Sequence, residues 1–102
     1  MRRAAKRDAN EWAIVDALRA VGATVLRLND SDCPDLLVGF HGVNFLMETK
    51  RPPGKRGGTS ADGQHLSEGQ AAWHAAWGGL RPVVVRTPGE ALAVIGVVAD
   101  EH

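Results

Sequence analysis

The sequence has little cysteine, no long apolar run and no net charge, and these absences exclude several classes of protein. Cys33 is the only cysteine in 102 residues, so no intramolecular disulfide can form, and we expect a reducing cytoplasm. No Cys/His cluster has the spacing of a zinc site. No stretch approaches the roughly 18 apolar residues of a membrane span. The basic segment 1–7 is not followed by the apolar core of a signal peptide. We therefore expect one small cytoplasmic domain.

Charge is balanced overall but is distributed unevenly along the chain. Twelve basic side chains offset twelve acidic ones, which taken alone argues against nucleic-acid binding. Local potential, however, steers a phosphate backbone more than net charge does. The alternative interpretation is that the basic clusters are solvated tails and loops. Eight of the basic residues form two clusters that could bind DNA: Arg2, Arg3, Lys6 and Arg7, and then Lys50, Arg51, Lys55 and Arg56.

The periodicity of apolar residues predicts an α/β domain with a mixed central sheet flanked by helices, in the order α-β-β-β-α-β-α. Capping boxes open the last two helices, and glycines follow the first two. A polar segment, 51–66, has no apolar period and predicts a long mobile loop. The expected elements are a helix from Asp8 or Asn10 to Val21, strands at 23–28, 35–40 and 43–50, a helix at 67–77, a strand at 82–86 and a helix at 88–98.

The strands 35–40 and 43–50 predict a hairpin that brings two acids together. If His41-Gly42 is a two-residue turn, Asp35 lies directly opposite Glu48, with Cβ atoms about 4.5–5.5 Å apart. Two carboxylates at that separation repel unless a cation lies between them. Lys50 falls on the same face as Glu48 because side chains alternate along a strand. The pattern indicates a site for a divalent metal such as Mg²⁺, to which the Thr49 carbonyl could contribute a neutral ligand.

The first helix carries a further candidate ligand. Its apolar stripe is formed by Ile14, Val15, Leu18 and Val21, and Glu11 falls within the same arc of the helix. Glu11 could complete the metal shell, or it could merely occupy the first turn, where the helix dipole favours acids. For Asp35, Glu48 and Lys50 the alternative is a salt-bridge group on an exposed face.

The helix at 67–77 carries four residues with two interpretations each. Gln70 could reach the active site, or it could only complete the capping box with Ser67. His74 could contact phosphate or be a semi-buried histidine with local partners. We expect Trp73 and Trp77 to pack in the core rather than to stack on bases.

These motifs together resemble the PD-(D/E)XK nuclease superfamily. Pro34-Asp35 followed by Glu48-Thr49-Lys50 at a strand end matches its signature. The order of elements from about residue 8 to residue 98 is similar to the small virus-type VRR-NUC domains of that superfamily. The resemblance implies a restriction-endonuclease-like fold, with the whole chain forming a single nuclease domain.

The resemblance also implies a role for each matching residue. Asp35 and Glu48 correspond to metal-binding acids, Lys50 to the catalytic lysine, Glu11 to an acid of the first helix and Gln70 to a glutamine near the active site. It implies dependence on Mg²⁺ or Mn²⁺ and hydrolysis that leaves a 5′-phosphate. For stand-alone viral members it implies homodimers that act on branched DNA such as Holliday junctions, encoded by a phage or prophage.

The residues alone predict metal-assisted hydrolysis of a phosphodiester, and the resemblance narrows this to a structure-selective DNA endonuclease. Two alternatives stay open within this interpretation. The first is a nickase, flap or nonspecific nuclease that processes phage DNA. The second is a DNA-binding module of the same fold that does not cut.

Overall fold

The computed structural model describes residues 5–52 and 65–97, of which residues 5–8 are described as backbone alone. Most of the predicted loop 51–66 lies outside the described residues. So do the side chains of Arg2, Arg3, Lys6, Arg7, Lys55 and Arg56, which we predicted to bind DNA. Within the described part, no helix has the length and apolar character that crossing a membrane requires.

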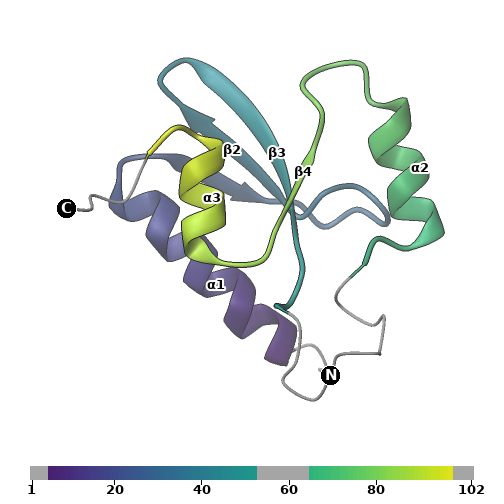
Figure 1. Ribbon diagram of the computed structural model, residues 1–102, viewed down its shortest axis with the longest axis horizontal. Helices are drawn as coiled ribbons and strands as arrows, with labels where there is room; N and C mark the ends of the chain where they lie inside the picture. Colours follow the sequence, from purple (N-terminus) through teal and green to yellow (C-terminus); the bar gives the residue numbers. More distant parts are fainter. Residues whose placement is uncertain (1–4, 53–64, 98–102) are drawn as a thin grey trace.

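The fold is a small α/β domain, as the sequence predicts, built on a four-stranded mixed sheet with three helices (Figure 1). The strands lie in the order β1-β2-β3-β4; the first three are antiparallel, and β4 runs parallel to β3. The elements are α1 (Ala5–Ala20), β1 (Thr24–Arg27), β2 (Leu36–Phe40), β3 (Val43–Thr49), α2 (Glu68–Ala76), β4 (Val83–Val85) and α3 (Pro88–Val94).

The predicted hairpin and its register are confirmed. His41 and Gly42 form the turn with φ angles of 50° and 81°, which suit a two-residue hairpin connection. Leu36 pairs with Met47. When this register is extended by one residue beyond β2, Asp35 falls opposite Glu48.

The core fills the space between one face of the sheet and the pair α1 and α3. Alternate residues of the strands point into it, and the apolar stripe of α1 packs against them. The prediction that Val21 belongs to this stripe is wrong, because Val21 follows the end of α1 and is 37% exposed. The fully buried residues of this core are Ile14, Val15, Leu18, Leu36, Val38, Met47, Val85 and Ala91.

The boundaries of α1 and α3 differ from the prediction. Helix α1 begins at Ala5 rather than at Asp8 or Asn10, so Asn10 and Glu11 lie well inside it. Helix α3 ends at Val94, four residues before the predicted end, because Gly96 adopts a φ of 90° and terminates the helix. The backbone N–H of Val97 then donates to the carbonyl of Leu92 at 2.9 Å.

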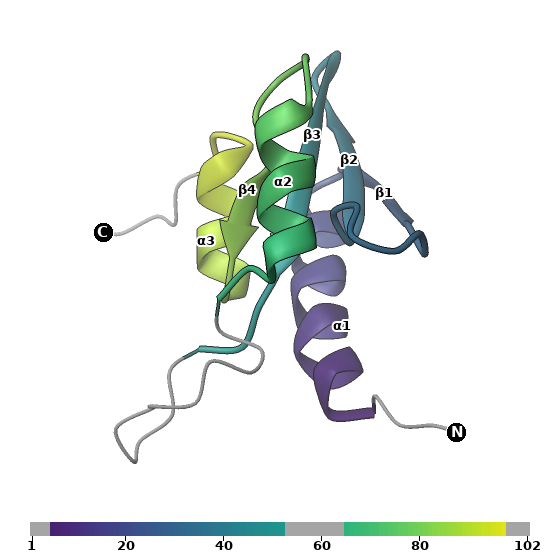
Figure 2. The same cartoon turned by 90° about the vertical axis from the view of Figure 1, so that its right-hand side faces the viewer.

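Helix α2 lies on the opposite side of the sheet from α1 and α3 (Figure 2). Its capping box is present: the Ser67 hydroxyl accepts from the Gln70 N–H, and the Gln70 side chain accepts from the Ser67 N–H. The helix ends at Ala76, one residue earlier than predicted, and Trp77 is its C-cap. The capping box fixes the start of α2 and therefore the direction in which Gln70 points.

The loop before β2 contacts the first turn of α2 through Asp32. A Cβ atom placed on Gly69 would lie 2.5 Å from Oδ2 of Asp32, so the carboxylate sits directly against the helix backbone. Asp32 itself has a φ of 68°, a conformation that Asp tolerates better than most residues. An acid at a helix N-terminus is also favoured by the helix dipole. This contact brings together two segments, the loop before β2 and α2, that are far apart in the sequence.

We expect Gly69→Ala to raise the free energy of unfolding by less than the roughly 1 kcal/mol that alanine usually gains over glycine inside a helix. The added methyl group must displace the Asp32 carboxylate, which is exposed and can move aside. Chemical denaturation measures the effect. Gly78→Ala is a control for the added methyl group, because a Cβ at Gly78 meets no atom within 4 Å. Gly69→Ala should be more stabilising when combined with Asp32→Gly, whereas additive effects of the two changes would contradict the contact.

Candidate functional site

Glu48 lies at the centre of the candidate site, with 0% of its surface exposed. Its side chain leaves β3 on the α2 side of the sheet, as the alternation predicts. Oε2 accepts a hydrogen bond from Nε2 of Gln70 at 3.1 Å, and Oε1 lies 3.4 Å from Nε2 of His74. A salt-bridge group on an exposed face is therefore the wrong interpretation of Glu48.

Gln70 combines the two roles that the sequence left open. Its Oε1 accepts from the Ser67 N–H at 3.0 Å, which completes the helix cap, and from Nζ of Lys50 at 2.9 Å. Its Nε2 donates to Glu48. One amide therefore joins the helix cap, the lysine and the buried acid.

Asp35 is held at the end of β3 by Thr49. Its Oδ2 accepts from the backbone N–H of Thr49 at 2.8 Å and from the Thr49 hydroxyl at 2.9 Å. The same hydroxyl lies 3.2 Å from Oε1 of Glu11. A hydroxyl has one hydrogen to donate, so the two carboxylates share it. We predicted a role for the Thr49 carbonyl; the contacts formed here come instead from its N–H and hydroxyl.

Glu11 is buried, as its place on the helical arc predicts. The alternative of a first-turn acid is wrong, because α1 begins six residues earlier, at Ala5. Its Oε2 accepts from Nε of Arg27 at 2.7 Å, and the Arg27 guanidinium lies 4.5 Å from the centre of the Trp12 ring. An arginine between an acid and an aromatic face is held by both. Glu11 is therefore fixed by β1 as well as by the end of β3.

Three contributors were not predicted from the sequence. Arg27 and Trp12 orient Glu11, and Nδ2 of Asn10 donates to the Lys50 carbonyl at 3.1 Å. Asn10 precedes Glu11 on α1, so consecutive polar residues reach the same end of β3. The sequence feature that could have indicated Asn10 is its position next to Glu11, at the edge of an otherwise apolar stripe.

Two groups near the site have shifted pKa values. Burial lowers the pKa of His74, and the positive charges of Arg81 and Lys50 lower it further, while Asp35 opposes the shift. His74 is therefore neutral near pH 7 and can donate its Nε2–H to Glu48. Burial raises the pKa of the Cys33 thiol, and the negative charges of nearby acids add to the shift. Cys33 stays a thiol, which agrees with a packing role.

Two predictions for α2 need revision. Trp77 is 47% exposed, so it is not part of the core; it stacks on the half-buried Trp73 with ring centres 4.9 Å apart. His74, predicted to bind DNA, is buried against Glu48, which favours the alternative of a histidine with local partners. Arg51 is exposed, and its predicted role in binding DNA stays a prediction.

Asp35 and Glu48 are the oxygen donors near the end of β3 that could hold a hard divalent cation. Across residues 5–52 and 65–97, no three His, Cys, Asp or Glu side chains gather into a metal-binding cluster. Mg²⁺ does not require one, since it commonly takes one or two carboxylates and completes its shell with water and phosphate oxygens. Asp35 and Glu48 supply two carboxylates from neighbouring strands. Glu11, the third predicted ligand, is engaged by Arg27 and Thr49.

We expect Thr49→Val to lower the free energy of unfolding by about 1–3 kcal/mol, because two buried carboxylates lose the hydroxyl that they share. Thr49→Ser keeps the hydroxyl and should cost less. Urea denaturation of both variants measures the difference. A larger loss in Thr49→Ser than in Thr49→Val would instead assign the stabilisation to packing of the Thr49 methyl group, which valine keeps and serine lacks.

We expect His74 to make stability depend on pH below about 6.5. The unfolded chain takes up a proton near the ordinary pKa of 6.5, whereas the folded chain resists it. Stability is therefore fully present above that pH and is lost as the pH falls toward the lowered pKa, by up to about 1.4 kcal/mol per pH unit. Denaturation in EDTA between about pH 7.5 and 5.5 should show a steeper loss for the wild type than for His74→Gln. Parallel curves would contradict this.

In comparisons with known proteins, no family model, curated protein or solved structure matches the chain.

Proposed function

We propose that this protein is a metal-dependent DNA endonuclease that hydrolyses phosphodiester bonds. The observation that carries the proposal is the hydrogen-bonded chain from buried Glu48 through Gln70 to the ammonium group of Lys50, one strand away from Asp35. Burying an acid and holding a cation beside it costs folding free energy in a small domain. Such arrangements are therefore common at functional sites. The resemblance to PD-(D/E)XK nucleases supports the same conclusion.

Asp35 and Glu48 are the residues that would hold Mg²⁺ or Mn²⁺. When bound, the cation would polarise the scissile phosphate and lower the pKa of a water molecule. Thr49 positions Asp35 through two hydrogen bonds to Oδ2. Gln70 and His74 orient Glu48 from α2. Ligands whose orientation is fixed by neighbouring hydrogen bonds bind metals more tightly.

Among the residues that the structure describes, Lys50 is well placed to stabilise negative charge on phosphate. Its backbone is fixed on both sides: the N–H donates to the Val85 carbonyl at 3.0 Å, and the carbonyl accepts from Asn10 at 3.1 Å. Its Nζ is held by Gln70. Preorganised donors need no rearrangement as charge develops in the transition state.

The resemblance further supports a homodimer that acts on branched DNA, in a phage or prophage setting. Symmetric cleavage of a four-way junction needs two active sites, and twofold symmetry is the commonest arrangement of protein subunits. The homodimer and the branched substrate are thus part of the proposal.

We expect metal-dependent cleavage when the purified protein is incubated with four-way junction, flap, nicked and linear duplex DNA. Glu48→Gln and Lys50→Ala should each reduce the rate about a hundredfold or more, because each removes a group that acts on the transition state. Asp16→Asn is the matched control: it neutralises an exposed acid on α1 and should leave the rate unchanged.

The outcomes separate the candidate functions. Absence of metal-dependent cutting on every substrate, with binding retained, would identify a DNA-binding module that does not cut. Equal cutting of linear duplex and junction would contradict a resolvase and support a nonspecific nuclease. Loss of binding rather than of cleavage in Lys50→Ala would make that lysine a phosphate contact.

A further inference from the structure

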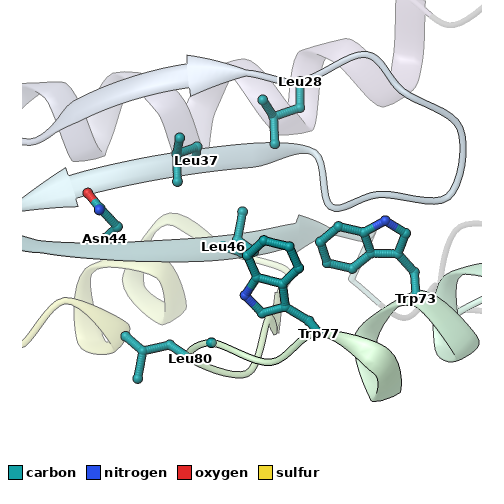
Figure 3. A pocket seen from close by; sticks show the side chains of 8 residues that line it. Leu28, Leu37, Asn44, Leu46, Trp73, Trp77 and Leu80 are labelled. Carbon is teal, nitrogen blue, oxygen red and sulfur yellow. The ribbon is translucent and has the colours of Figure 1, made fainter.

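The α2 side of the sheet carries an apolar groove that the proposed cleavage chemistry does not use. It has a volume of about 420 Å³, within the range of small-molecule and cofactor sites. Leucines of the sheet form its floor, and two tryptophans overhang it (Figure 3). The apolar residues that line it are Leu28, Leu37, Leu46, Trp73, Trp77 and Leu80.

The two tryptophans present a fixed aromatic surface. The planes of Trp73 and Trp77 are 12° apart, so the rings are nearly parallel. A Cβ atom on Gly79 would lie 2.9 Å from Nε1 of Trp77, so the indole rests against the backbone at that glycine. Trp77 and Leu80 are nonetheless 47% and 56% exposed. Large apolar side chains exposed together commonly mark a binding surface.

The groove neighbours the candidate active site along β3 and α2. Leu46 on its floor lies two residues before Glu48 on the same face of β3. Trp73 precedes His74, and their rings meet edge to face with centres 6.4 Å apart. A ligand in the groove therefore lies beside the residues proposed to act on phosphate.

The chemistry of the rim narrows the choice of ligand. Asn44 is the one side-chain amide among the described residues that line the groove, and it can pair with the polar edge of a flat ligand. Arg81 follows Leu80 in the sequence, and its positive charge is close enough to His74 to lower the pKa of that histidine. Aromatic rings, an amide and adjacent cations are the features with which proteins bind single-stranded nucleic acid.

We propose that this groove holds an unpaired nucleobase of the DNA substrate, stacked on the tryptophan pair, with its phosphate directed toward Lys50. The proposal rests on the nuclease function proposed above and narrows its substrate class. A base inside an intact duplex must first be unstacked, which costs a few kcal/mol, whereas a base in a flap, a gap or another single-stranded segment is already available. The groove would therefore select DNA with unpaired nucleotides.

The test measures binding in EDTA, so that it does not depend on cleavage. Fluorescence anisotropy compares a labelled oligothymidine with a fully paired duplex of equal length, using wild type, Trp77→Leu and Trp77→Phe. We expect Trp77→Leu to weaken binding of oligothymidine about tenfold and to leave duplex binding within about twofold, because stacking on one base is lost. Trp77→Phe keeps an aromatic ring and should recover most of the affinity.

Other outcomes would overturn the proposal. One is that Trp77→Leu weakens binding of both DNAs alike, or of neither. Another is a change in sedimentation alone, which would make the groove a contact between two copies of the chain. Selective binding of oligothymidine without any Mg²⁺-dependent cleavage would support base binding in the groove and contradict the nuclease function. Cleavage without this selectivity would contradict base binding in the groove alone.

Discussion

Burial of the Glu48 carboxylate sets the position of α2. A carboxylate with no solvent exposure must accept hydrogen bonds from the protein, or the cost of removing it from water would be several kcal/mol. Gln70 and His74 supply partners only if α2 is capped at Ser67 and faces β3. The Asp32 carboxylate lies against the same end of the helix, at Gly69. Architecture and candidate chemistry thus depend on one buried charge.

The end of β3 joins the two sides of the sheet. On the α2 side, Glu48 and Lys50 meet Gln70; toward α1, the hydroxyl of Thr49 lies between Asp35 and Glu11. Alternation along a strand explains how adjacent residues serve opposite faces. A site built at the end of a paired strand is held more rigidly than one built on a loop, which suits chemistry that depends on fixed donors.

The sequence predicts what local rules control. The hairpin register follows from a two-residue turn, and the burial of Glu11 and Glu48 follows from helical and strand periodicity. The partners of those residues do not follow, because Arg27 and Gln70 reach them through packing of distant segments. Trp77 was misplaced for a similar reason: helical spacing groups it with Trp73, but the helix ends one residue earlier. The metal, the substrate and the oligomeric state stay predictions.

If the protein is the nuclease proposed above, the shared side-chain carbonyl of Gln70 has a consequence for turnover. Oε1 accepts from both the Ser67 N–H and the Lys50 ammonium, so a phosphate that draws Lys50 away removes only one of its two donors. The helix cap stays closed while the lysine is engaged elsewhere. After release of product, Lys50 would return to the same acceptor, Oε1 of Gln70. The start of α2 would then not need to rearrange in each cycle.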